Sequence, residues 1–119
     1  MTNTNSKEKA LIISSLALEK KAEDVKILDM RDVTYFCDYF VIAGGESFKK
    51  TTAIADHIID SLYAFGVRIS HKEGAREGQW IILDYSDVIV HVFQEQARWF
   101  YDLERLWGDA KTIAVTDEK

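Results

Sequence analysis

The sequence predicts an α/β fold, a single domain in which a mixed five-stranded β-sheet is flanked by helices. Three observations predict it. Helical segments and short β-type runs follow one another in the order α-β-β-α-β-β-β-α. A near-continuous apolar run at residues 39–43 is typical of a central strand that is buried on both faces. Two β-type runs, at residues 80–83 and 88–93, are separated by a short polar turn, as in a hairpin.

Local patterns define the first helix and the first strand. Residues 7–22 have helical spacing, and Ser6 is the expected N-cap. The expected buried face of this helix consists of Leu11, Ile12, Ser15, Leu16 and Ala22. Residues 25–29 form a predicted short strand, and residues 31–36 fit either one helical turn or a loop.

The central strand and the clearest helix come next. The strand at residues 39–43 stops at two glycines, and Ser47 is the expected N-cap of the helix that follows. Apolar side chains recur at helical spacing as far as Phe65, and Gly66 is the expected C-terminal stop. The alternating residues 67–71 predict another strand, so this part of the chain predicts a parallel crossover.

The hairpin gives the sheet two chemically different faces. A turn at Tyr85 and Ser86 sets Leu83 opposite Val88, whereas a turn at Ser86 and Asp87 changes the partners but not the faces. One face is wholly apolar and is the expected core: Ile81, Leu83, Val88, Val90 and Val92. The other, here called the mixed face, consists of Trp80, Ile82, Asp84, Ile89, His91 and Phe93. Because this face carries Trp, His and Asp beside apolar residues, we expect it to pack against another part of the protein and to bind a partner.

Composition and charge restrict the class of protein. The 47% hydrophobic and 29% charged residues describe an ordinary globular domain, and no apolar run is long enough to span a membrane. The polar N-terminus and the single cysteine, Cys37, favour a cytoplasmic protein. The net charge of -5 and the scattered basic residues disfavour nucleic acid as the main contact and favour a basic protein partner.

Residues 44–47, Gly-Gly-Glu-Ser, invite interpretation as a phosphate-binding loop. They lack both the GxxxxGK[ST] and the GxGxxG spacing, so a tight strand-to-helix turn with an N-cap is the simpler interpretation. A Gly-Ser turn also occurs in nucleotidyltransferases, which hold two Mg²⁺ ions with a pair of carboxylates on a nearby strand. No predicted strand of this chain carries such a pair.

The remaining candidates for chemistry also have plain interpretations. Asp84 and Asp87 form an attractive acid/base pair, but aspartates at hairpin ends usually bond to the turn backbone. His91 has no cysteine or second histidine at metal-ligand spacing. Cys37 lacks a recognisable base and is expected to be a small buried hydrophobe. These residues therefore predict no metal site and no cofactor.

Large aromatic residues gather between Trp80 and Trp107. Trp, Tyr and Arg dominate interface hot spots, because they bury much area at a small entropic cost. For Trp80, Tyr85, Arg98 and Tyr101, a place in an interface and a place in the core are equally open.

A series of motifs in this order resembles the ribosomal silencing factor family, also called the Iojap family. The matching residues are 36–43 with Gly44 and Ser47, then 53–56, 73–74 and 80–93, and finally Arg98, 100–101, 103–104 and 106–107. The chain departs from the family pattern at Ser86, where Gly is common, and at Lys50, where Gln is common. The resemblance covers roughly residues 7–110.

The resemblance implies a nucleotidyltransferase-like fold without the catalytic carboxylates, and a role that is not enzymatic. Factors of this family bind the large ribosomal subunit through its protein L-fourteen and sterically prevent the small subunit from joining. Translation thereby falls when nutrients are short. The resemblance also implies self-association as a homodimer.

Carry-over from the family and the hairpin geometry together give the expected partner-binding residues: Trp80, Asp84, Tyr85, His91, Arg98 and Tyr101, with Glu73 and Glu104 as rim charges. Trp80 is the expected apolar anchor, Asp84 the acceptor for a Lys or Arg of the partner, and Arg98 the partner of a carboxylate or an aromatic ring.

The expected organisation is a tail at residues 1–6, one domain at 7–111 and a tail at 112–119. The alternatives are a nucleotide-binding enzyme of the nucleotidyltransferase type and a direct RNA binder.

Overall fold

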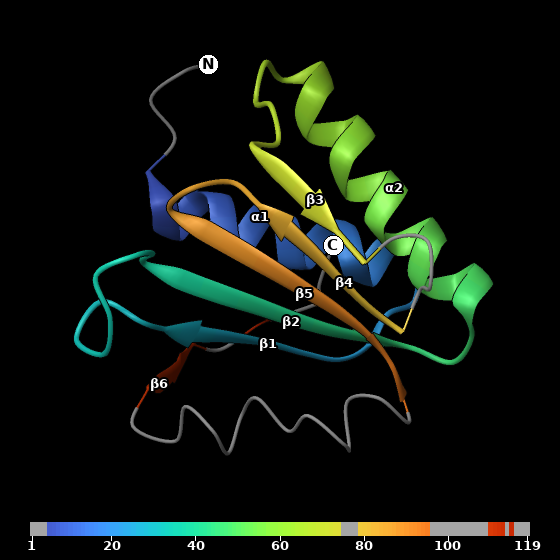
Figure 1. Cartoon of the computed structure of the whole chain (residues 1–119), viewed down its shortest axis with the longest axis horizontal. Coiled ribbons are helices and arrows are strands. Elements are labelled where there is room, and N and C mark those ends of the chain that lie inside the picture. Colours follow the sequence, from blue (N-terminus) through green and yellow to red (C-terminus); the bar gives the residue numbers. More distant parts are fainter. Residues whose placement is uncertain (1–4, 75–78, 96–109, 114, 116–119) are drawn as a thin grey trace.

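Two α-helices and six β-strands make up the described part of the chain in the computed structural model, which describes residues 5–74, 79–95, 110–113 and 115 (Figure 1). In chain order the elements are α1 (Ser6–Glu19), β1 (Glu23–Asp29), β2 (Tyr39–Gly45), α2 (Phe48–Ala64), β3 (His71–Glu73), β4 (Trp80–Asp84), β5 (Val88–Gln94) and β6 (Lys111–Ile113). They form one α/β domain with a mixed six-stranded sheet, one strand more than predicted. The additional strand, β6, crosses the boundary that was expected between the domain and its C-terminal tail.

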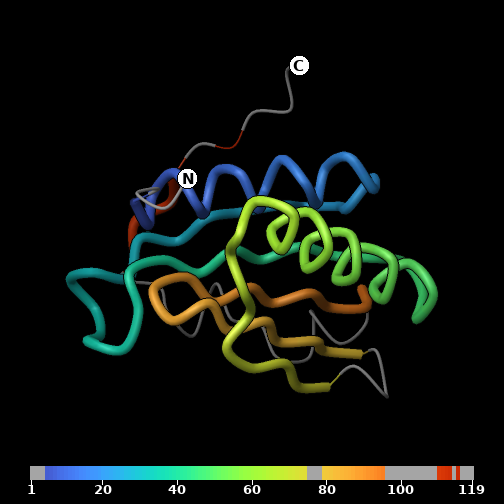
Figure 2. The backbone as a smooth tube through the Cα atoms, turned by 90° about the horizontal axis from the view of Figure 1, so that it is seen from above, coloured from blue at the N-terminus to red at the C-terminus, as the bar shows by residue number. Residues whose placement is uncertain are grey.

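The strand order is β3-β4-β5-β2-β1-β6 (Figure 2). β2 and β5 pair in parallel, and the other neighbours pair antiparallel. The prediction of a strand at residues 67–71 is wrong. The strand begins only at His71, where pairing with β4 starts. The crossover through α2 therefore leads to the edge of the sheet, and β2 finds its parallel partner in β5 instead.

β2 is the central strand that the apolar run predicted, since all seven of its residues are buried. Alternate side chains enter two separate clusters. Tyr39 and Val41 face a larger cluster, which also contains the buried side chains of α1 and α2. Phe40 and Ile42 face a smaller cluster on the opposite side of the sheet. Both helices therefore cover the same face (Figure 2).

α1 differs from its prediction at its start and in its buried face. The N-cap is Asn5 and not Ser6, because Asn5 Oδ1 accepts a hydrogen bond of 2.8 Å from the Glu8 N–H. Leu11 and Ile12, expected inside, are 37% and 38% exposed. The buried residues are Ala10, Ile13, Ser14, Leu16 and Ala17. Apolar residues surround this helix, so spacing alone fits more than one face, and the small alanines lie where the helix approaches the sheet.

α2 agrees with its prediction at both ends. Ser47 Oγ accepts a hydrogen bond of 3.1 Å from the Lys50 N–H, which makes Ser47 the N-cap. Gly66 ends the helix in the left-handed conformation, with φ of 85°. The buried residues are Thr51, Ile54, Ala55, Ile58 and Leu62, all of which were expected on the buried stripe, whereas Phe65, expected to continue it, is 62% exposed.

Both helices end with the same backbone motif but with different residues at its left-handed position. After α1 the Ala22 N–H donates to the Ala17 carbonyl, and Lys21 has φ of 61°. After α2 the corresponding left-handed residue is Gly66. A side chain with a Cβ is strained in this conformation, so α1 ends less favourably than α2.

We predict that Lys21→Gly raises the free energy of unfolding by about 1 kcal/mol, because it removes this strain. The matched change Gly66→Ala introduces the strain and lowers the free energy of unfolding by about the same amount. An added Cβ meets no atom within 4 Å at this position, so a steric clash does not add to the effect. Urea unfolding measures both, and equal stability of wild type and both variants would contradict the prediction.

Candidate functional site

The β4–β5 hairpin has the second of the two registers that the sequence left open. Ser86 and Asp87 form the turn, so Leu83 pairs with Val90 and Ile82 pairs with His91. Ser86 has φ of 76°, and its N–H donates a hydrogen bond of 2.7 Å to Asp84 Oδ1. The faces are those predicted, because this register shift does not exchange them.

The apolar face of the hairpin is core, as expected. Ile81, Leu83, Val88, Val90 and Val92 are all fully buried in the cluster that α1 and α2 cover. Any binding surface on this hairpin must therefore lie on the mixed face.

The mixed face has a buried centre and half-buried surroundings. Phe93 is fully buried and His91 is 6% exposed, whereas Trp80, Ile82, Asp84 and Ile89 are half-buried. α1 and α2 lie on the other side of the sheet. The mixed face thus offers apolar area and one carboxylate at a surface that these two helices leave uncovered.

A hydrogen bond and ring contacts fix the side chain of Trp80. Its Nε1–H donates to His91 Nδ1 over 3.1 Å. Its ring stacks on Phe93, with centroids 5.0 Å apart and an angle of 24° between the planes. The edge-on ring of Phe40 holds His91 from another strand at 4.5 Å. Trp80 is therefore pre-positioned, which lowers the entropic cost of using it as an anchor.

His91 is a neutral hydrogen-bonding group here. Its Nδ1 accepts a hydrogen bond, so its proton lies on Nε2, and this buried Nε2 has no hydrogen-bond partner among the described residues. Burial lowers the pKa of His91 to about 4, because the charged imidazolium would lose its hydration. The residue can offer an N–H donor to a partner but not a positive charge at neutral pH.

Tyr85 lies in the core and not on the mixed face. It is 3% exposed and belongs to the cluster under the helices. Its hydroxyl is buried and has no hydrogen-bond partner in the part of the chain that the structure describes, and burial raises the pKa of Tyr85 to about 12. The signal was present in the sequence, because the alternation of Ile81 and Leu83 continues to Tyr85 beyond the end of β4. Of the two interpretations left open for Tyr85, the structure supports the core.

The expected carboxylates have different surroundings. Asp84 holds the hairpin turn with one oxygen, so the turn interpretation is supported, and its side chain is still half-buried at the mixed face. Glu73 is exposed on the edge strand β3, opposite Ile82, and its Oε2 lies 2.8 Å from His71 Nε2. Arg98, Tyr101 and Glu104 lie outside the described residues.

The other candidates for chemistry have structural roles. The turn at residues 44–47 ends in the N-cap of α2, and Asp87 Oδ1 accepts a bond of 2.8 Å from Lys9 Nζ. Cys37 is buried, and desolvation together with nearby carboxylates raises its pKa to about 12, so the thiolate is disfavoured. Within the described ranges, no three His, Cys, Asp or Glu side chains could jointly hold a metal ion. None of the described helices is long and apolar enough to cross a bilayer.

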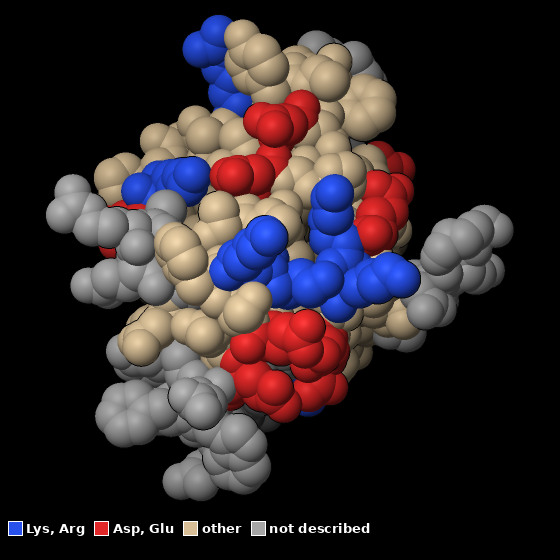
Figure 3. All heavy atoms as spheres, turned by 90° about the vertical axis from the view of Figure 1, so that its right-hand side faces the viewer, with Lys and Arg blue, Asp and Glu red and all other residues tan. Residues whose placement is uncertain are grey.

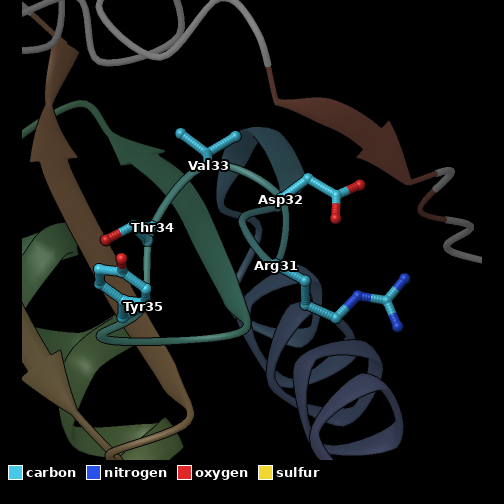
Figure 4. A pocket seen from close by; sticks show the side chains of 5 residues that line it. All are labelled: Arg31, Asp32, Val33, Thr34 and Tyr35. Atoms are coloured by element: carbon cyan, nitrogen blue, oxygen red, sulfur yellow. The ribbon is translucent and has the colours of Figure 1, made fainter.

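The loop between β1 and β2 surrounds a hollow that the sequence did not indicate. Residues 31–35 line it, and Figure 4 shows the Arg31 side chain directed away from Thr34 and Tyr35. Arg31 is instead paired with Asp29, at 2.7 Å and 2.9 Å. Polar groups do not converge in this hollow, so we assign it no chemistry, although Tyr35 is fully exposed beside it.

Comparison with known proteins decides which family shares this arrangement. The family model described as ribosomal silencing factor during starvation matches residues 3–119. The chain belongs to this family. A ribosomal silencing factor from Bacillus subtilis is 41% identical over 106 residues, 89% of this chain and 90% of that protein. The chloroplastic protein Iojap of Zea mays is 31% identical over 106 residues, 89% of this chain and 46% of its own length.

A solved structure agrees with the fold. The X-ray structure of a protein from Chromobacterium violaceum superimposes with a TM-score of 0.85 at 31% identity, and the match covers 97% of both chains. The resemblance to ribosomal silencing factors is thus confirmed, and the family consists of regulatory proteins rather than enzymes.

The burial of His91 predicts a stability that depends on pH. The histidine pKa is 6.5 in the unfolded chain and about 4 in the fold, so the unfolded state binds more protons between these values. Stability is fully present above pH 6.5 and falls as the pH approaches 4. Relative to the variant His91→Gln, which cannot titrate, the wild type should lose about 2 kcal/mol between pH 7 and pH 5 in urea unfolding. Equal losses in both proteins would contradict the buried neutral imidazole.

Tyr85 gives a second prediction that separates a core role from a binding role. Tyr85→Phe should leave the stability equal or raise it by about 1 kcal/mol, because it removes a buried hydroxyl that has no partner. Tyr85→Ala should lower it by about 3 to 5 kcal/mol, through the cavity that it leaves. Thermal or urea unfolding measures both, and a fully stable Tyr85→Ala variant would show that the residue does not belong to the core.

Proposed function

We propose that the chain represses translation by binding the large ribosomal subunit through ribosomal protein L-fourteen, and by sterically blocking the small subunit from joining, under nutrient limitation. The observation that carries the proposal is the mixed face of β4 and β5 in a member of the ribosomal silencing factor family. This apolar surface surrounds a buried donor, His91 Nε2–H, that has no hydrogen-bond partner among the described residues. The bound chain acts in the cytoplasm, where the subunits join.

The make-up of the mixed face fits a protein partner. Stable protein contacts have an apolar centre from which charges are depleted, with a polar rim around it. Trp80, Ile82 and Ile89 supply half-buried apolar area. Asp84 lies beside them, and Glu73 lies on the neighbouring strand. Trp80 is the anchor in this proposal because its ring is already fixed by His91 and Phe93.

Charge supports a basic partner. The chain has a net charge of -5, and a negatively charged protein is steered towards a positively charged one. In the proposed contact, Asp84 and Glu73 meet Lys or Arg side chains at the rim. The Nε2–H of His91 donates to an acceptor of the partner, which would satisfy a group that is otherwise buried without a hydrogen bond. Arg98, Tyr101 and Glu104 remain proposed contributors to the same contact.

The size of the domain accounts for the proposed block. Its principal extents are 35 × 33 × 29 Å. Two ribosomal subunits join through direct contact, so a folded domain of this thickness at their interface keeps the surfaces apart without any catalytic step. Self-association as a homodimer stays a separate prediction.

The nucleotidyltransferase alternative finds no support in the described strands. None of them carries two carboxylates at alternate positions, which the two-metal mechanism requires on one face.

We predict that Ile82→Lys and Ile89→Lys each weaken binding to isolated large subunits at least tenfold. A positive charge in the apolar centre repels a basic partner and is costly to bury. Both positions are half-buried, so these changes disturb the fold less than Trp80→Ala, which would also remove the stack on Phe93. Co-sedimentation with purified large subunits measures the affinity.

The matched control is Tyr63→Lys, which places the same charge on an exposed aromatic position of α2. It should bind like the wild type. Wild-type affinity in both isoleucine variants would remove the mixed face as the contact, and failure of the wild type to bind any large subunit would defeat the proposed function itself.

A further inference from the structure

Four lysines from two distant segments come together at one side of the molecule. Lys20 and Lys21 follow the end of α1, and Lys49 and Lys50 lie in the first turn of α2. The ammonium Nζ of Lys50 donates to the main-chain carbonyl of Lys20 over 3.4 Å, which joins the two pairs. Figure 3 shows Lys and Arg side chains gathered on this side, the right-hand side of Figure 1, where α2 begins. We call Lys20, Lys21, Lys49 and Lys50 the lysine patch.

Local structure disfavours a lysine at three of the four positions. The N-terminal end of a helix carries partial positive charge, so cations are disfavoured there, yet the first turn of α2 has two lysines and no acidic residue. Lys21 has φ of 61°, a conformation that glycine adopts more easily. Positive charge gathered where local structure disfavours it indicates a use outside folding.

The chemistry of the patch fits phosphate groups. The lysine ammonium is a compact point charge with three donors, and the bond to Lys20 leaves two of the three donors of Lys50 directed elsewhere. Lys20, Lys21 and Lys49 are exposed. The end of α1 and the start of α2 thus present several ammonium groups on one side of the molecule, where they could pair with phosphate groups.

The surroundings indicate a supporting contact and not an independent one. Acidic side chains lie next to the basic group in Figure 3, and the whole chain carries -5. Long-range attraction to a polyanion is therefore weak, and phosphates are bound only when another contact holds them close. The mixed face supplies such a contact in the function proposed above.

We propose that the lysine patch binds the phosphate backbone of ribosomal RNA next to the site where the mixed face docks. This inference rests on the proposed function for its placement on the large subunit. The sequence alone disfavours nucleic acid as the main contact, because the basic residues are scattered along the chain. In the fold, four of these lysines form a local basic surface, which suits a supporting contact.

The salt dependence of binding tests the proposal. Each lysine–phosphate contact adds about 1 to the slope of log affinity against log salt concentration, because it releases a counterion. The variant Lys49→Gln/Lys50→Gln should therefore bind large subunits with a slope about 1 to 2 smaller in magnitude than the wild type. The control Lys7→Gln/Lys111→Gln removes the same charge from exposed positions elsewhere and should keep the wild-type slope.

Zero-length coupling of amines to carboxylates separates RNA from an acidic protein as the occupant. In the complex with large subunits, the lysine patch should give ultraviolet-induced crosslinks to RNA and no amide bonds to a ribosomal protein. Equal slopes for the patch variant and the wild type, or amide bonds from the patch to a protein, would overturn the proposal. If the wild type failed to bind large subunits, the proposed function itself would fail, whereas equal slopes in a wild type that does bind would overturn the patch alone.

Discussion

The parallel pairing of β2 with β5 is the constraint on which the rest of the structure depends. Seven consecutive residue pairs, from Tyr39 with Val88 to Gly45 with Gln94, place two apolar strands in the centre of the sheet. Such strands must be covered on both faces, because both sets of their side chains are apolar. α1 and α2 cover one face, so the surface that these two helices leave uncovered carries the mixed face. The position of the proposed docking surface is therefore a consequence of how the core is closed.

In the proposed contact, the mixed face would use the same residues for stability and for recognition. The hydrogen bond from Trp80 to His91 and the stack on Phe93 fix an aromatic anchor, and they belong to the smaller core cluster at the same time. Within the described ranges, the fold leaves the buried Nε2 of His91 without a hydrogen-bond partner, at a cost in stability. A partner that accepts a hydrogen bond from His91 Nε2–H would offset this loss of stability in the complex. In the proposed contact, recognition would use the shape of the mixed face and a prepared donor, in keeping with a regulatory factor.

Long and strongly patterned helices and strands could be predicted from the sequence. Which distant segments lie next to one another in the fold could not. The continuous run of β2, the caps of α2 and the two hairpin faces were predicted because each has a local cause. The buried face of α1 was mispredicted, since its apolar residues surround the helix and only the sheet selects one side. Residues 67–70 alternate like a strand but find no partner strand. The lysine patch is joined by a contact between Lys20 and Lys50, 30 positions apart along the chain, which no local pattern reveals.

Calorimetric titration of the chain with isolated ribosomal protein L-fourteen tests the central claim most directly, because it removes RNA and all other ribosomal proteins from the comparison. The account predicts saturable binding with one chain per L-fourteen molecule and a negative heat-capacity change, since apolar area of the mixed face is buried. Absence of binding to L-fourteen by a chain that still sediments with large subunits would contradict the account.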